Sequence, residues 1–218
     1  MATNSFSETD KIFHSDGYRL GQTWAEKGTN PVSLVDGQRE LYHTVDGLID
    51  SLLRQAERFG KKAECVRGCS WCCYQPVFAN SLEINCLGEY FRSNFSTSLI
   101  EETARKTSRK NSHVSVMKES EMLHHKSPCP LLNDGACMAY EARPMACRIY
   151  LSTSLSSCLN FYIDPGHPES YPALLEFPLR AGRMLNEGFT AAFRQNGFKV
   201  KEYRLEEGLD RFFNNHPC

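Results

Sequence analysis

The chain has 218 residues, 41% of them hydrophobic, and a formal net charge of −1 from 25 Lys and Arg against 26 Asp and Glu. This balance describes an ordinary globular protein and excludes a strong overall field that would draw the chain to nucleic acid or to an acidic membrane. The N-terminal stretch lacks a charged-then-apolar leader pattern, and no segment has the apolar length of a membrane span. We therefore expect a cytoplasmic protein without a membrane partner.

The first part of the chain shows little hydrophobic periodicity. Residues 1–37 contain scattered glycines, which predicts a peripheral N-terminal arm with one short helix near Tyr18 to Trp24. From Leu41 to Phe59, apolar residues recur at steps of three and four. That spacing predicts an amphipathic helix that ends at Gly60.

Four cysteines then fall within nine residues, in the run CVRGCSWCC. The run lies between Gly60 and Pro76, so it predicts a loop. Four thiols this close cannot all pair with one another, because a disulfide requires separated and correctly aimed Cα atoms. In a reducing compartment, clustered thiols more often bind a metal than form disulfides. The first cluster of candidate metal ligands is Cys65, Cys69, Cys72 and Cys73.

The segment after the loop is polar and helical in pattern. Asn80 or Ser81 is expected to cap a helix that runs to about Phe95, with Cys86 on its apolar stripe as a buried structural thiol. The stretch 98–125 is compatible with a helix and carries basic residues at 105–110. No aromatic residues interleave with these charges, so we interpret them as a solvated helix surface and do not expect a nucleic-acid partner.

A second group of cysteines follows this helical segment. Asn133-Asp134-Gly135 is a strong turn signal, and Arg143-Pro144 is suited to start a short helix. The second cluster of candidate metal ligands is Cys129, Cys137, Cys147 and Cys158.

The last part of the chain has helical spacing. After a connector at 164–168, a long segment from Pro172 and a shorter one from Tyr203 to Phe213 are both amphipathic, while the tail residue Cys218 is interpreted as incidental. The fold class predicted is mainly α, with a small irregular cysteine-rich metal-binding core packed among helices. The expected organisation is a peripheral arm, a cysteine-cluster domain and a C-terminal helical extension packed on the same core, at 1–37, 38–165 and 166–218.

Thiolates suit zinc and iron, and the two clusters predict a metal centre closed by distant parts of the chain. Adjacent side chains such as Cys72 and Cys73 rarely bind one mononuclear ion, because they diverge along the backbone. Three arrangements stay open: two four-thiolate zinc sites, one iron–sulfur cluster with four cysteines left over, or one mononuclear site with spare thiols. His124, His125 and His167 are additional candidates as ligands because they lie close to the cysteines in sequence.

Two arginines near the second cluster have two interpretations. Beside a multi-thiolate centre, Arg143 and Arg148 would offset negative charge and donate hydrogen bonds to sulfur. Alternatively, they would be structural and bind Glu141 or a helix end.

These motifs resemble the YkgJ-type cysteine-cluster family, a domain regarded as chelating zinc or iron. The similarity comprises CVRGCSWCC, CPLLNDGAC and MAYEARPMAC with Arg148, and it includes Tyr140 and Pro144; Cys158 resembles a later cysteine of some relatives. It spans about Cys65 to Cys158, under half of the chain. The resemblance implies metal chelation, and flagellin lysine N-methylases carry a similar cluster. Cys65, Cys69 and Cys72 also have the spacing of radical SAM enzymes, but the chain shows no repeated strand–helix pattern of a barrel.

Three functions follow as hypotheses. The first is a metal-binding protein that holds zinc or iron, with an iron–sulfur cluster included. The second is a cluster-dependent group-transfer enzyme such as a protein lysine methylase, with a substrate pocket between the cysteine core and the C-terminal helices. The third is a redox sensor with an exposed, unligated thiol of low pKa. No GxGxxG or P-loop motif indicates a nucleotide site, and the sequence leaves open whether the protein is an enzyme.

Overall fold

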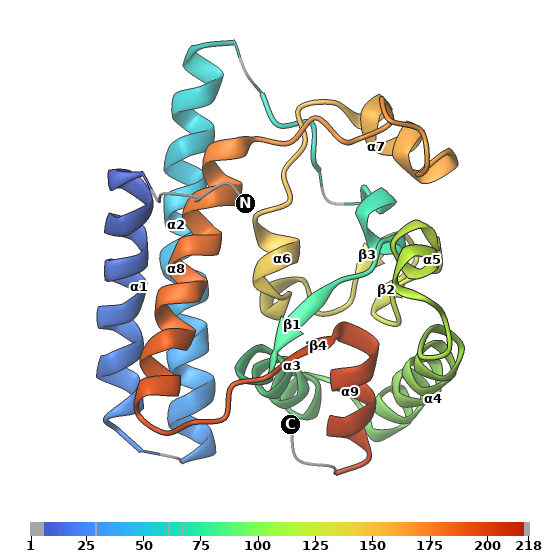
Figure 1. Cartoon of the computed structure of the whole chain (residues 1–218). Helices are drawn as coiled ribbons and strands as arrows, with labels where there is room; N and C mark the ends of the chain where they lie inside the picture. Colours follow the sequence, from blue (N-terminus) through green and yellow to red (C-terminus); the bar gives the residue numbers. More distant parts are fainter. Residues whose placement is uncertain (1–6, 29, 61, 67, 216–218) are drawn as a thin grey trace.

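A computed structural model describes residues 7–28, 30–60, 62–66 and 68–215. Two groups of helices form the molecule, and the cysteine-bearing segments lie between them (Figure 1). Short strands make up the rest of the regular structure, so the fold class is mainly α, as predicted. Within the described residues, no helix is both long enough and apolar enough to cross a membrane.

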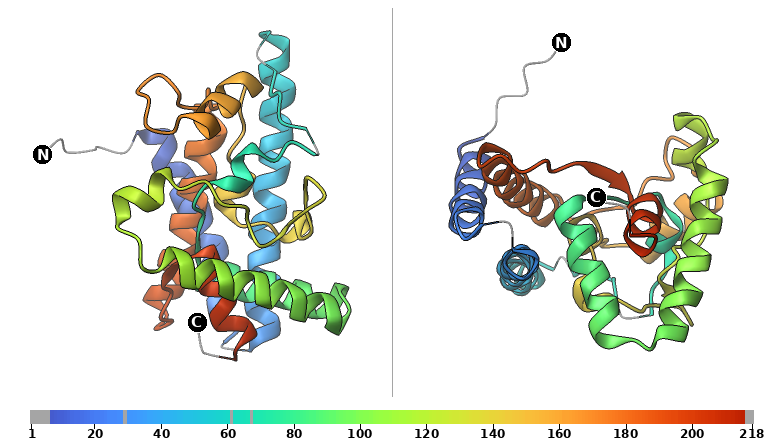
Figure 2. Two further views of the ribbon diagram at one scale, coloured as in Figure 1. Left: turned by 90° about the vertical axis from the view of Figure 1, so that its right-hand side faces the viewer. Right: turned by 90° about the horizontal axis from the view of Figure 1, so that it is seen from below.

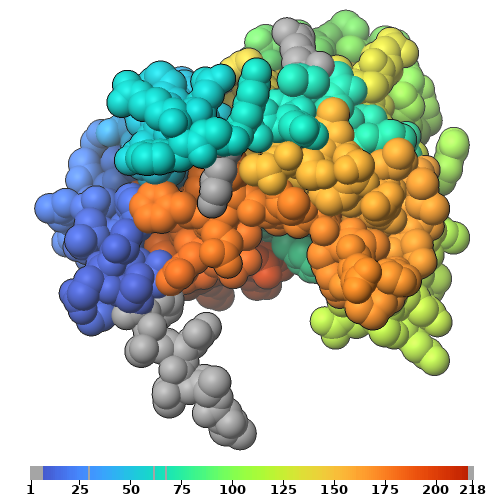
Figure 3. Space-filling view, turned by 90° about the horizontal axis from the view of Figure 1, so that it is seen from above, coloured from blue at the N-terminus to red at the C-terminus, as the bar shows by residue number. Residues whose placement is uncertain are grey.

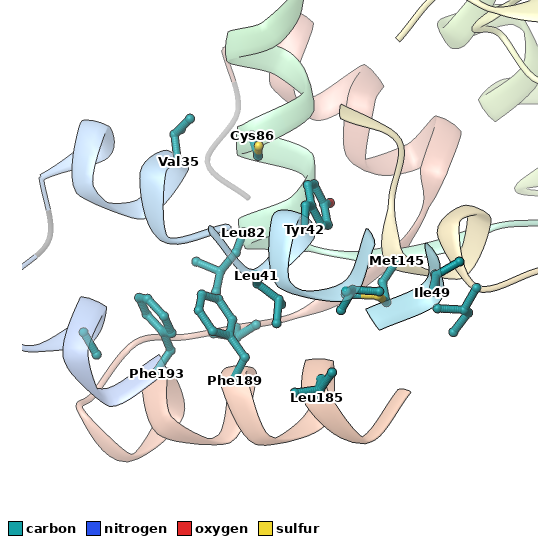
Figure 4. Close-up of a cluster of buried hydrophobic side chains, with 14 residues drawn as sticks. Val35, Leu41, Tyr42, Ile49, Leu82, Cys86, Met145, Leu185, Phe189 and Phe193 are labelled. Carbon is teal, nitrogen blue, oxygen red and sulfur yellow. The ribbon is translucent and has the colours of Figure 1, made fainter. Parts of the chain in front are cut away.

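Three long helices form the first layer: α1 (Glu8–Ala25), α2 (Pro31–Arg58) and α8 (Glu176–Gln195). They lie side by side in both Figure 1 and the view from below in Figure 2. Their inward side chains form one apolar cluster that includes Leu41, Val45, Phe189 and Phe193, all fully buried. Figure 4 shows Leu41, Phe189 and Phe193 within this cluster. Apolar burial of this kind contributes about 1.5–3 kcal/mol for each large side chain, so this layer is a principal source of stability.

The N-terminal segment differs from the sequence prediction. Instead of one short helix near Tyr18, α1 extends over 18 residues from a capping box formed by Ser7 and Asp10. Asn30 caps α2 with Pro31 in its first turn, so this helix begins ten residues before Leu41 and runs through the expected boundary at residue 37. Its end at Arg58, ahead of Gly60 with φ +73°, agrees with the prediction.

Glycine in α1 is a packing residue rather than a helix breaker. A Cβ built on Gly17 would collide with the backbone carbonyl of Leu185, and one on Gly188 would collide with the carbonyl oxygen of His14. The backbones of α1 and α8 therefore approach each other more closely than any larger side chain would permit. Gly17 and the other glycines of residues 1–37 were interpreted as signs of irregular structure, which is why the length of α1 was underestimated.

Replacing two glycines with alanine should have opposite effects on the stability of the fold, because Gly17 lies at the contact of α1 with α8 whereas Gly47 does not. Gly17→Ala forces a methyl group into a backbone and is expected to lower the free energy of unfolding by about 1–3 kcal/mol. Gly47→Ala in α2 meets no atom within 4 Å and should instead raise it by about 0.5–1 kcal/mol, because alanine favours the helix. Urea denaturation of both variants checks this, and equal effects would contradict the packing described.

The second group comprises helices and a two-stranded sheet. It contains α3 (Ser81–Asn94), α4 (Thr97–Val114), α5 (Glu119–His124), α9 (Leu205–Phe213), β1 (Phe78–Asn80) and β4 (Glu202–Arg204). The two strands are antiparallel, with Ala79 opposite Tyr203. A capping box of Asn80 and Glu83 begins α3 where the sequence predicted it. Phe91 and Leu209 lie at the centre of the second apolar cluster.

The cysteine-bearing segments connect the two groups through short elements. These are η1 (Trp71–Tyr74), the hairpin β2 (Leu132–Asn133) and β3 (Ala136–Cys137), η2 (Tyr140–Ala142), α6 (Met145–Arg148) and α7 (Leu155–Ile163). The predicted turn at 133–135 and the predicted short helix after Pro144 are both confirmed. The irregular cysteine-rich core is therefore held between two helical layers.

Candidate metal centre

The first cysteine cluster is attached to two distant parts of the chain. Near its start, the sulfur of Cys65 accepts a hydrogen bond from the backbone N–H of Ser152 at 3.1 Å. The backbone N–H of Glu64 also donates to the carbonyl oxygen of Ser152 at 2.9 Å. At its end, the carbonyl oxygen of Cys73 accepts a bond of 2.7 Å from the N–H of Cys129. The cluster is therefore fixed at both ends.

The hairpin β2–β3 brings two cysteines of the second cluster together. Asp134 and Gly135 have φ of 48° and 76°, the positive values that a two-residue type I′ turn requires. The strand register places Leu132 opposite Cys137, and the N–H of Leu132 donates to the carbonyl oxygen of Cys129 at 3.0 Å. Cys129 and Cys137 thus lie on the two arms of one tight hairpin.

The other two cysteines of this cluster lie on short helices. Cys147 is in α6, whose first N–H, that of Met145, donates to the buried carboxylate of Glu83 at 2.6 Å. Cys158 is in α7, which packs on η1 through the ring of Tyr162, at 5.1 Å from Trp71. Figure 3 shows the loop and the segment around α7 adjoining on one face of the molecule.

Seven of the eight candidate ligands line a single cavity of about 500 Å³. The seven are Cys65, Cys69, Cys72, Cys73, Cys129, Cys137 and Cys147. Cys158 is absent from the wall and is 4% exposed. The opposite wall comes from α2, through Asp46, Ile49, Asp50 and Leu53. Cysteines from both clusters, about sixty residues apart in sequence, therefore line one cavity.

The thiols surround the cavity without converging on a point. Among the described residues, no three side chains of His, Cys, Asp or Glu are arranged to hold a metal ion, and the cysteines of both clusters are free thiols. Metal binding would therefore require the thiols to move closer together than they are in this structure. Clustered thiols are the donors that zinc and iron prefer, so the set fits such a group.

Burial and backbone hydrogen bonds act on these thiols in opposite directions. Burial raises the pKa of Cys129 to about 12 and raises the pKa values of Cys69 and Cys137 as well. Backbone N–H groups partly oppose this effect, because those of Trp71, Leu131 and Ala139 lie against the sulfurs of Cys69, Cys129 and Cys137 and lower their pKa values. In each pair the donor is two residues after the cysteine. Such fixed donors stabilise a thiolate and orient it as a ligand.

A family model described as "CxxCxxCC: putative zinc- or iron-chelating domain" matches residues 64–165. The chain is therefore similar to this cysteine-cluster family over residues 64–165, which are called the cysteine-cluster domain below. The match covers all eight clustered cysteines and agrees with the resemblance found in the sequence. No curated protein and no solved structure matches the chain.

In the cysteine-cluster domain, Arg148 has the structural role that was one of its two interpretations. Its side chain is 1% exposed, donates to the carbonyl oxygens of Arg143 and Glu141, and forms an ion pair with Asp46 of α2. Its guanidinium also lies 3.9 Å from the ring centre of Tyr42. Arg148 therefore joins the cysteine-bearing segment to the three-helix layer.

Arg143 is the arginine that acts on the thiols. It stacks over the ring of Tyr140 at 3.9 Å, and its charge lowers the pKa values of Cys72 and Cys137. Asp46, 3.9 Å from Arg143 and also paired with Arg148, holds both arginines at the cavity wall. Sequence analysis missed Asp46, because an acidic residue on an amphipathic helix has no local signal that it faces a distant loop.

None of the three histidines considered as ligands lines the cavity. His125 instead packs against His113, with tilted rings whose centres are 5.3 Å apart, and His167 accepts a hydrogen bond from the N–H of Glu169. Cys86 is buried in the first apolar cluster, as predicted. Cys218 lies outside the described residues.

Without metal, Cys72 is expected to be the most reactive thiol of the cysteine-cluster domain. A hydrogen bond from Cys73 lowers the pKa of Cys72 to about 7, while the same bond raises the pKa of Cys73. Its thiolate fraction should thus rise through pH 7, far below the range in which Cys129 ionises. Alkylation of metal-free protein between pH 6 and 8, followed by peptide mass mapping, checks this. Preferential labelling of Cys129 would contradict it.

Proposed function

We propose that the domain binds zinc or iron through the thiolates of both cysteine clusters, within the cavity that they line. The single observation that carries this proposal is the lining itself: the loop 65–73, the hairpin and α6 all direct cysteines to one space. Seven thiols from segments this distant in sequence line one cavity, and such a concentration of thiols favours metal binding. The metal would hold together a region whose regular structure consists only of short elements.

The surroundings of the thiols support metal binding over disulfide formation. The sulfur of Cys65 accepts a hydrogen bond from the N–H of Ser152. Backbone N–H groups also lower the pKa values of Cys69, Cys129 and Cys137 against the larger effect of burial, and Arg143 adds positive charge near Cys72 and Cys137. Together these groups offset the negative charge that several thiolates accumulate in a partly buried site. A metal supplies the remaining positive charge that the arrangement lacks.

Metal analysis with an absorption spectrum tests the proposal on full-length protein purified without oxygen. Zinc in a colourless sample would support a structural zinc site. Iron with acid-labile sulfide in a brown sample would support an iron–sulfur cluster. Replacing both Cys129 and Cys137 with alanine should lower the amount of bound metal, whereas Cys86→Ala should not change it, because that thiol lies in the apolar core. Folded wild-type protein that contains no metal and takes up neither zinc nor iron would overturn the proposal.

Group transfer is the second candidate function, because a second cavity adjoins the first. It measures about 490 Å³ and lies between β1, α6 and α8. A substrate pocket between the cysteine core and the C-terminal helices was expected from the sequence. Pro76, Val77, Ala146 and Tyr150 line both cavities. A small organic molecule that is released from the protein by denaturation would support this function. Its loss in Ala146→Trp, with metal content unchanged, would assign it to this wall.

A further inference from the structure

The eight cysteines fall into two sets according to the elements that hold them. One set, here called the loop set, is Cys65, Cys69, Cys72 and Cys158. The other, the hairpin set, is Cys73, Cys129, Cys137 and Cys147. Each set contains four thiols, the number that a closed zinc site or one iron–sulfur cluster requires.

The loop set is assembled by α7 and by the segment before it. Ser152 binds both the backbone of Glu64 and the sulfur of Cys65. The first N–H of α7, that of Leu155, donates to the carboxylate of Glu64 at 2.6 Å. Farther along α7, Tyr162 contacts Trp71 and also Tyr74, whose ring centre is 5.0 Å away. These contacts hold α7, and with it Cys158, against the loop that carries the other three thiols.

The hairpin set is assembled by different contacts. The carbonyl oxygen of Cys73 binds the N–H of Cys129, and the hairpin register places Cys137 beside the turn that begins at Cys129. Cys129 and Cys137 both pack against the second apolar cluster, whereas Cys65, Cys69 and Cys158 do not. Glu83 holds the start of α6, which carries Cys147.

The two adjacent cysteines of η1 are attached to different sets. The carbonyl oxygen of Cys73 binds the N–H of Cys129 in the hairpin set, whereas Trp71, next to Cys72, contacts Tyr162 of α7, the helix that carries Cys158. The division between the sets thus falls between two consecutive residues. Both lie in the 3₁₀ helix η1, where successive side chains diverge by about 120°.

We propose that the protein holds two metal centres, one bound by the loop set and one by the hairpin set, with Cys72 and Cys73 assigned to different centres. This proposal rests on the proposed metal-binding function and specifies it. It replaces the single centre that the sequence suggested as the point where both clusters meet. The centres would adjoin at η1, so a change at Cys72 would affect both.

Titration of metal-free protein with Co²⁺ under anaerobic conditions tests the two centres. Tetrahedral Co²⁺ thiolate has a visible absorption that counts filled sites without an activity assay. We expect two equivalents for the wild type and for Cys86→Ala, the matched control with a buried thiol outside both sets. Cys158→Ala and Cys137→Ala should each bind one equivalent, and the double variant none. Should Cys158→Ala fail to fold, as judged by circular dichroism, Cys69→Ala tests the same set.

The possible outcomes distinguish the proposal of two centres from the metal-binding function on which it rests. One equivalent in the wild type that either substitution abolishes would overturn the two centres and leave the metal-binding function intact. Two equivalents in the wild type that are both lost on substitution in either set would also overturn the division. A folded wild type that binds no Co²⁺, and also no zinc or iron, would overturn the function itself.

Discussion

Removing the metal is expected to unfold the cysteine-bearing segments (the loop 65–73, the hairpin β2–β3, α6 and α7) while the layer of α1, α2 and α8 remains folded. Structural zinc contributes apparent binding free energies of about 10–16 kcal/mol at neutral pH, which exceeds the total stability of most domains. The cysteine-bearing segments have only the two-residue strands of one hairpin and short helices to replace that contribution. The three-helix layer, by contrast, has its own buried apolar cluster.

The two tryptophans report these regions separately. Trp71 lies in η1 beside Tyr162, whereas Trp24 lies at the end of α1 and donates to Glu40 at 2.7 Å. In Trp24→Phe, addition of a chelator should therefore shift the emission of Trp71 to that of an exposed indole. In the matched variant Trp71→Phe, the emission of Trp24 should change little. Equal responses from both tryptophans, or no response at Trp71, would contradict a metal-dependent domain.

Arg148→Met is expected to lower the free energy of unfolding by about 3 kcal/mol or more. The substitution keeps an apolar stem but leaves the carbonyl oxygens of Glu141 and Arg143 without their donor and Asp46 without its closer partner. It also removes the cation from the ring of Tyr42. Denaturant unfolding of metal-free and metal-loaded protein measures the loss.

Two further variants distinguish the stabilisation by the buried, hydrogen-bonded Arg148 from the effect of a positive charge alone. Arg148→Lys retains the charge without the planar fork and should recover only part of the loss. Arg19→Met removes an exposed partner of Asp16 and should cost less than about 1 kcal/mol. If the Arg19 and Arg148 variants lose the same stability, the anchoring role assigned to Arg148 is wrong.

Local signals in the sequence predicted the elements that depend on local chemistry. The cap at Asn80, the turn at Asp134-Gly135 and the short helix after Pro144 each follow from hydrogen bonds or backbone preferences within a few residues. The two cysteine clusters were predicted as a metal site for the same reason, because thiols at short spacing indicate a soft ligand. The family match to 64–165 agrees with that interpretation.

The features that were missed depend on contacts between distant residues. Gly17 appeared to interrupt a helix because its partner, the backbone of Leu185, is far away in sequence. The ion pair of Asp46 with Arg148 and the pairing of β1 with β4 are equally non-local. No periodicity indicates which charged residue of a helix faces a loop a hundred positions later. The proposed division of the cysteines at η1 likewise depends on the hydrogen bonds and ring contacts of α7, which no local pattern in the sequence indicates.

The pairing of β1 with β4 bears on whether the family segment can fold autonomously. Residues 64–165 contain β1, but its only paired strand in the described part of the chain is supplied by residues 202–204. The N–H of Leu205 also donates to the carbonyl oxygen of Val77, and Leu209 completes the second apolar cluster. A fragment cut at residue 165 would expose an unpaired strand edge beside the cysteine loop and so would be prone to self-association. We therefore expect the family segment to need the C-terminal segment in order to fold.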